Sequence, residues 1–160
     1  MLGIYEKKLE RINSVTVPRG MELLFNYYKR LIEVLKLKPQ LTKDMISAYK
    51  AGNKEMLCEC ADGFSSLKNK VENLYTSYIR LWESTNKPFG MEVIDLRYGG
   101  IITRLNTASR RLHEYCDGKI DSLEELEQER LYYSSKGAET NADKPFAFIH
   151  HHSKIISPAI

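Results

Sequence analysis

The sequence has no long apolar run and no leader-like beginning. No stretch of the 160 residues approaches the roughly 18 uninterrupted apolar residues that a membrane-spanning helix needs. The first residues, MLGIYEKKLER, become charged within six positions and lack the apolar core of a signal peptide. We therefore expect a protein with no membrane span and no visible secretion signal.

Cysteine is scarce, with three residues in the whole chain. The number is odd, and Cys58 and Cys60 stand two positions apart in a helical pattern, where they point to different faces. The single residue between them also departs from the two-residue spacing of zinc and redox motifs. The pattern argues against a disulfide framework and predicts a reducing compartment, the cytoplasm.

Neither charge nor motifs indicate a nucleic-acid-binding or catalytic protein. Lysine and arginine number 24 against 21 acidic residues, and the resulting net charge of +3 is spread along the chain. The sequence contains no glycine-rich phosphate loop, no Ser-His-Asp order and no zinc-binding helix motif. Three adjacent histidines at residues 150–152 cannot all face one ion. We predict no catalytic residue, metal, cofactor or nucleic-acid partner for this chain.

Helical periodicity is abundant. Residues 18–37 carry apolar side chains three and four positions apart, the spacing of one face of an α-helix. Pro39 is expected to end this helix. Thr42 is expected to cap a short second helix that runs through Tyr49 and closes at Gly52. The apolar positions of the first helix are Met21, Leu24, Phe25, Tyr28, Leu31, Ile32 and Leu35.

Two longer apolar seams follow, over about residues 55–84 and 91–116. The first runs from Leu57 to Leu81 and the second from Ile94 to Tyr115, both in alternating steps of three and four. Proline and glycine in residues 86–90 break the helix between them. The pattern predicts an all-α fold, an antiparallel helical bundle around this long hairpin with helix 18–37 as its third member.

The remaining sequence completes the predicted domain organisation. A short acidic helix is expected near residues 121–125, with Ser122 as its N-cap and Glu125 at capping-box spacing. Residues 1–133 are expected to form one helical bundle domain. Residues 134–160 are expected to form a polar link and an extended, apolar C-terminal tail.

One region, residues 82–104, departs from what a bundle requires. Gly99 and Gly100 lie in the middle of a predicted helix, where the pair costs on the order of 2 kcal/mol relative to alanine. Either another backbone or a bulky side chain such as Trp82 packs closely there, or the surface of a partner approaches that spot.

Two carboxylates in this region have alternative interpretations. Glu92 and Asp95 share a helical face, as the acid and nucleophile of a glycosidase would. More often such a pair is solvated, stabilises the start of a helix or binds an arginine. We therefore predict an interface or pocket wall rather than a catalytic site. Its candidate residues are Trp82, Asn86, Lys87, Phe89, Glu92, Asp95, Arg97, Gly99 and Gly100.

The same region carries a resemblance to a known family. The run NKPFGMEVIDLRYGG at residues 86–100, with Arg104-Leu105 and the ending from Arg111-Leu112 through residues 118–127, resembles the C-terminal helical domain of bacterial family 20 glycoside hydrolases. These enzymes are β-N-acetylhexosaminidases. The similarity extends upstream into residues 28–35 and, more weakly, into residues 155–158, so it covers most of the chain.

The resemblance implies an exo-acting enzyme that removes terminal β-linked N-acetylglucosamine or N-acetylgalactosamine. In such enzymes the 2-acetamido group of the substrate is the nucleophile, and an Asp–Glu pair on a (β/α)₈ barrel assists it. A barrel needs about 250 residues in alternating strands and helices, a pattern that this chain lacks. No catalytic residue is therefore carried over to this sequence.

Two hypotheses follow. In the first, the chain is the accessory helical domain of a hexosaminidase, and it packs on the catalytic barrel or a second subunit. In the second, it is an independent helical module that binds a partner helix or peptide in a groove of the bundle.

Overall fold

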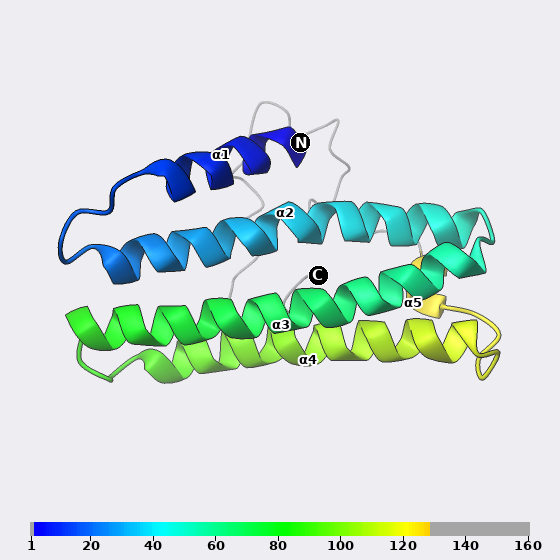
Figure 1. Cartoon of the computed structure of the whole chain (residues 1–160). Helices are drawn as coiled ribbons and strands as arrows, with labels where there is room; N and C mark the ends of the chain where they lie inside the picture. The colour runs from blue at the N-terminus through cyan, green and yellow to red at the C-terminus, as the bar shows by residue number, and fades with distance from the viewer. Residues whose placement is uncertain (1, 129–160) are drawn as a thin grey trace, which may run out of the picture.

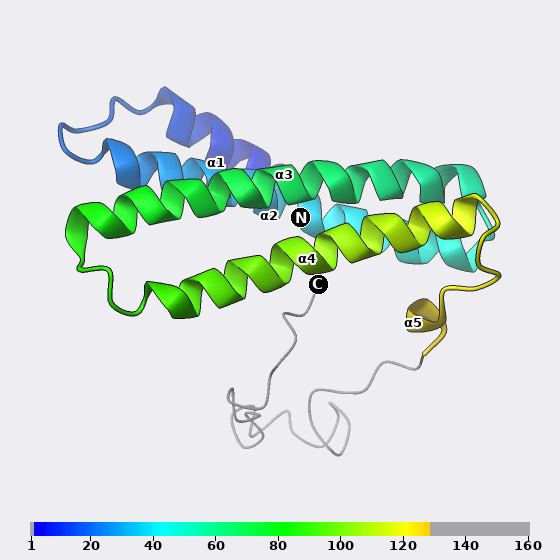
Figure 2. The ribbon, with the colours of Figure 1, turned by 90° about the horizontal axis from the view of Figure 1, so that it is seen from below.

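The computed structural model describes residues 2–128, which form an all-helical arrangement (Figure 1). Helix α3 lies between α2 and α4 and packs against both, while α1 covers the far side of α2. Figure 2 views the same antiparallel helices from below, with the short α5 set apart from the long ones. The predicted all-α bundle is confirmed. The helices are α1 Leu2–Ser14, α2 Glu22–Lys50, α3 Lys54–Thr85, α4 Met91–Cys116 and α5 Glu124–Glu127.

The predicted hairpin is confirmed in α3 and α4, whose bounds lie within one residue of those expected. Its seams supply most of the buried core, because residues three and four apart line the face that each helix turns inward. Asn53 caps the start of α3, where its side-chain oxygen accepts a hydrogen bond from the Met56 amide at 3.1 Å. The buried seam residues are Leu57, Cys60, Phe64, Leu67, Val71 and Leu74 of α3, with Leu105 and Leu112 of α4.

The predicted end of a helix at Pro39 is wrong, because α2 continues through this proline to Lys50. Val34, Leu41 and Ala48 lie on both sides of Pro39 and are all buried in the core. Their packing outweighs the cost of about 3 kcal/mol that proline imposes inside a helix. No separate helix starts at Thr42, whose hydroxyl donates to the Lys38 carbonyl within α2 at 3.0 Å.

Helix α1 was not predicted. Its half-buried side chains Tyr5, Leu9 and Ile12 follow the same steps of four and three as the other helices. An ion pair of 3.0 Å between the Lys36 amino group and the Glu6 carboxylate also connects α1 to α2. Dense charge on the exposed face of α1 hides this weaker apolar stripe in the sequence.

The prediction against disulfides is wrong for Cys58 and Cys116, which form a disulfide in the structure. The antiparallel hairpin brings the start of α3 beside the end of α4, so their Cα atoms lie 6.1 Å apart despite 58 residues of separation. Cys60 is the unpaired cysteine, and burial raises the pKa of its thiol. The odd number of cysteines therefore reflects one disulfide and one core residue.

The short helix α5 is present, but the predicted capping box is wrong. The helix begins at Glu124, no side chain caps it, and Glu125 binds Arg111 instead. The expectations for residues 134–160 and for the histidines at 150–152 fall outside the described residues. Within residues 2–128, no helix combines the length and the apolar character that a membrane crossing requires.

Candidate functional site: the hairpin loop and the outer face of α4

The loop between α3 and α4 is held in one shape by hydrogen bonds from its ends. The Trp82 indole donates to the Lys87 carbonyl at 2.9 Å, and the Asn86 amide donates to the Trp82 carbonyl at 2.7 Å. Gly90 has a φ of +92°, a left-handed conformation that favours glycine, and its amide donates to a Glu92 carboxylate oxygen at 2.9 Å. The loop is therefore ordered by this chain's own residues.

The carboxylates of Glu92 and Asp95 each have their own structural partner. Glu92 accepts the Gly90 amide at the start of α4, whereas Asp95 accepts the Tyr75 hydroxyl at 2.6 Å. This hydrogen bond raises the pKa of the Tyr75 hydroxyl, because the phenol is the donor. Glu92 therefore acts at the beginning of α4, whereas Asp95 binds a tyrosine of α3, a partner that was not expected.

Gly99 does not have the close neighbour that was expected from within the chain. A β-carbon at Gly99 would meet no described atom within 4 Å. The Trp82 ring instead lies beside Gly90, 3.9 Å from the position of a β-carbon there. The interpretation in which Trp82 packs on Gly99 is therefore wrong. Gly99 is exposed on α4, and Gly100 is half-buried.

Large apolar side chains are exposed on the outer face of α4 and on the loop that precedes it. Phe89 is 82% exposed, Val93 53% and Leu96 77%. Val93 and Leu96 are three residues apart and share one face of α4, while Phe89 lies in the loop just before the helix; we call these three residues the outer stripe. Gly100 follows Leu96 by four residues on the same face. Sequence reasoning found Phe89 but missed Val93 and Leu96, although the spacing that reveals them is the same signal as in the buried seam.

A cluster of aromatic rings supports the loop end from inside the bundle. The Tyr78 ring of α3 lies 5.5 Å from the Tyr27 ring of α2, measured between ring centroids. It lies 6.0 Å from the Trp82 ring of α3 and 6.0 Å from the Tyr98 ring of α4. The Tyr98 ring also stacks on Tyr75 at 5.0 Å. Burial, followed by the neighbouring Tyr27, raises the pKa of the Tyr98 hydroxyl. These contacts hold three helices at a fixed spacing behind the outer stripe.

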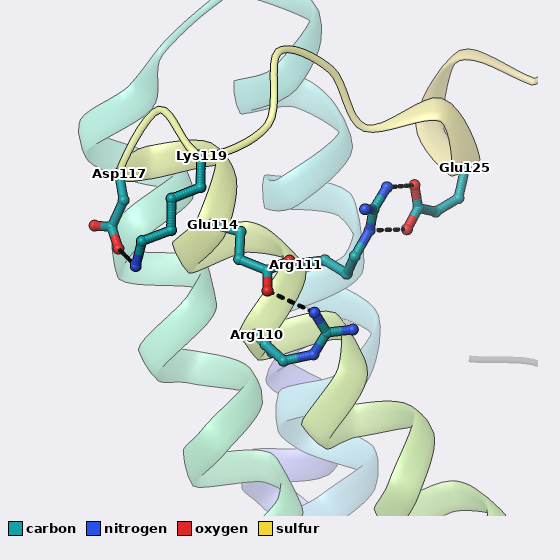
Figure 3. Close-up of polar contacts among 6 residues, drawn as sticks. All are labelled: Arg110, Arg111, Glu114, Asp117, Lys119 and Glu125. Atoms are coloured by element: carbon teal, nitrogen blue, oxygen red, sulfur yellow. Dashed lines mark hydrogen bonds and ion pairs between the residues drawn. The ribbon is translucent and has the colours of Figure 1, made fainter.

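Charged contacts concentrate at the opposite end of α4. The Arg111 guanidinium binds Glu125 through two hydrogen bonds of 2.9 Å, while Arg110 pairs with Glu114 at 2.6 Å and Lys119 with Asp117 at 2.8 Å (Figure 3). The Arg111 contact lowers the pKa of the Glu125 carboxyl. This bidentate pair fastens α5 to α4.

A second contact anchors α5 to α2. The Tyr49 hydroxyl donates to Glu127 at 2.6 Å and accepts the Leu123 amide at 3.0 Å. Leu123 itself is buried in the core. A pocket of about 240 Å³ lies beside this anchor, between α2, α4 and α5, with Phe64 and Leu112 in its apolar wall and Arg104 and Arg111 among its polar groups.

The described residues contain no cluster suited to metal binding, since no three histidine, cysteine, aspartate or glutamate side chains converge there. The nine candidate residues do gather at the hairpin loop and the first half of α4, as their sequence positions require. Trp82, Asn86 and Glu92 shape the loop, whereas Phe89 faces outward.

A comparison with protein families finds a match to the glycoside hydrolase 20C C-terminal domain over residues 1–144. No curated protein matches the chain. The matched region includes all the described helices, the hairpin loop and the outer stripe. The chain therefore belongs to the family of C-terminal domains of the 20C glycoside hydrolases.

Proposed function

We propose that this chain is the accessory C-terminal helical domain of a β-N-acetylhexosaminidase. In this proposal a separate (β/α)₈ barrel removes terminal β-linked N-acetylglucosamine or N-acetylgalactosamine. The observation that carries the proposal is the family match over residues 1–144 of the 160-residue chain. A barrel of about 250 residues does not fit in this length, so the chemistry is assigned to another part of the enzyme.

The domain's role in this proposal is to pack against the catalytic barrel or a second subunit. The ordered loop, the exposed Phe89 and the open side of Gly99 support this role, because a solvated helical bundle requires none of them. Glu92, Asp95 and Arg97 then act as interface groups and have no catalytic part. The proposed interface or pocket-wall residues are Trp82, Asn86, Lys87, Phe89, Glu92, Asp95, Arg97, Gly99 and Gly100.

The test compares two proteins with one chromogenic substrate, an aryl β-N-acetylglucosaminide. The purified chain is expected to release no product, whereas the polypeptide that joins it to its barrel is expected to turn the substrate over. An aryl β-glucoside, which lacks the 2-acetamido nucleophile, serves as the control and should not react. Turnover of the acetamido substrate by the isolated chain would contradict the proposal.

The alternative is an independent helical interaction module. The observation that favours it is an open, mainly apolar groove between the start of α2 and the end of α3, with Met21, Leu24, Leu81 and Trp82 among its residues. The DNA upstream of the Met1 codon distinguishes the two. A continuous frame that encodes a barrel favours the accessory domain, and a start site without a neighbouring hydrolase gene favours the module.

The bacterial source and cytoplasmic location remain predictions. The Cys58–Cys116 disulfide removes the cysteine argument for a reducing compartment. Fractionation of the native cells, followed by thiol titration of the recovered protein, tests the location and the cysteine state together.

A further inference from the structure

We propose that the outer stripe of Phe89, Val93 and Leu96 is the surface that the catalytic domain of the same polypeptide covers. This inference rests on the proposed function and deepens it, because it names the contact surface and chooses between the two possible partners. The proposed occupant is the catalytic domain of the longer polypeptide. The proposal excludes a second copy of the 160-residue chain as the occupant.

Helix α4 has two apolar faces. Leu105 belongs to the core of the bundle and Tyr98 and Ile101 pack against it, so the helix is already held in place without the stripe. Val93 and Leu96 expose half or more of their surface on the other side of the helix, and Phe89 is exposed in the loop that leads into it. A solvated helix carries polar residues there, and a contiguous apolar stripe marks a contact site.

The outer stripe is preorganised by hydrogen bonds within the chain. The Trp82–Lys87 and Gly90–Glu92 hydrogen bonds fix the loop that carries Phe89. The Tyr75–Asp95 hydrogen bond fixes the first turns of α4 against α3. A partner therefore meets a rigid surface and loses little conformational entropy when it binds.

The apolar area of the outer stripe is small. The three exposed side chains present on the order of 400 Å² of apolar surface, about half of the roughly 800 Å² that each partner buries in a specific complex. A domain on the same polypeptide meets the stripe at an effective concentration on the order of millimolar, so a small patch is sufficient. The family match supports the presence of such a domain, since the matched family is a C-terminal domain of a glycoside hydrolase.

The residues around the outer stripe define what kind of surface can cover it. Gly99 lies next to it with no described atom within 4 Å of its β-carbon position, which lets another backbone approach α4 closely. Glu92 comes one residue before Val93, and Arg97 comes one residue after Leu96. On a 3.6-residue helix these two steps run in opposite directions around the axis, so the two charged residues lie on opposite sides of the stripe. The covering surface is therefore expected to be apolar, with a cationic group opposite Glu92 and an anionic group opposite Arg97.

The direct test is hydroxyl-radical footprinting with mass spectrometry on the isolated chain and on the polypeptide that includes the catalytic domain. Phe89 and Leu96 are expected to be oxidised at least threefold more slowly in the longer polypeptide. Met56, an exposed apolar residue at the other end of the hairpin, serves as the internal control and should keep its rate. Equal rates for Phe89 and Leu96 in the two proteins would overturn the inference. So would protection that appears in the isolated chain as its concentration rises, because a second copy would then be the occupant.

A charge introduced on the stripe gives an independent test. Leu96→Glu in the longer polypeptide is expected to restore the oxidation rate of Phe89 to its value in the isolated chain, and Met56→Glu is expected to leave it unchanged. In the isolated chain both variants should keep the wild-type circular dichroism, which verifies that they fold. A Phe89 rate that stays low in Leu96→Glu counts against the inference. The proposed function fails separately, if the longer polypeptide releases no N-acetylglucosamine.

Discussion

Gly63 of α3 faces Leu41 of α2 so closely that a β-carbon at residue 63 would lie 2.6 Å from the Leu41 Cδ1 atom. Leu41 is itself buried in the core, so its side chain has little room to move away. Gly99 of α4 differs, because a β-carbon there would meet no described atom within 4 Å. The two helical glycines therefore have different physical roles, and substitutions separate them.

Gly63→Val is expected to lower the free energy of unfolding by about 1–3 kcal/mol, because the branched side chain overpacks the contact between α2 and α3. Urea unfolding followed by circular dichroism measures this change. Gly63→Ser is the milder companion and should lie between the wild type and Gly63→Val. A Gly63→Val chain as stable as the wild type would mean that α2 and α3 are not packed as described.

Gly99→Ala is expected to raise the free energy of unfolding of the isolated chain by roughly 0.5–1 kcal/mol, since alanine is the better helix former and the site is open. The same urea experiment measures it. If the catalytic domain covers this part of α4, the gain is expected to shrink or reverse in the longer polypeptide. A loss of stability in the isolated chain would show that residue 99 is already in contact with another part of it.

Leu105 and Leu96 are a matched pair on α4. Leu105 is 1% exposed, so Leu105→Ala is expected to cost about 2–5 kcal/mol of unfolding free energy through lost burial and a cavity. Leu96 belongs to the outer stripe, so Leu96→Ala should change the isolated chain by less than about 0.5 kcal/mol. Thermal and urea unfolding of both variants give the comparison. Equal losses would contradict the assignment of one leucine to the core and the other to the surface.

Part of the fold was predictable because the hairpin's information is local. Steps of three and four along α3 and α4 identify the buried faces, and proline and glycine at residues 86–90 mark the turn. Two of the errors came from interactions between distant segments. Burial of Val34 and Leu41 carries α2 through Pro39, and the antiparallel pairing brings Cys58 to Cys116. Neither effect can be read from the residues next to it.

The candidate site at residues 82–100 stays a prediction. It was chosen from the unusual residues of the loop and from the glycine pair. The sequence did not separate the groups that shape the loop, such as Trp82 and Glu92, from the outward-facing Phe89. That distinction depends on hydrogen bonds made across the turn. Val93 and Leu96 of the outer stripe can be identified from the sequence, because they are apolar residues of α4 that lie outside its buried seam.

The attachment of α5 is expected to depend on pH through Glu125. Arg111 lowers the pKa of this carboxyl in the folded chain below its ordinary value of 4.5. A carboxyl whose folded pKa is depressed contributes stability above its unfolded pKa, and the contribution is lost as the pH falls through the folded pKa. We therefore expect α5 to be fully held near neutral pH and to loosen as the pH falls below about 4.5.

Hydrogen exchange of the Leu123 amide, followed by NMR, measures the attachment locally, because this amide donates to the Tyr49 hydroxyl only while α5 is docked. In the wild type its protection should fall on acidification. In Glu125→Gln the protection should already be low at neutral pH and should change little with acid, since the titrating partner of Arg111 is gone. Glu124→Gln, a neighbouring change that leaves the bidentate pair intact, should behave as the wild type does. If both variants lose protection equally, the acidity of the whole segment holds α5, and the specific pair between Arg111 and Glu125 does not.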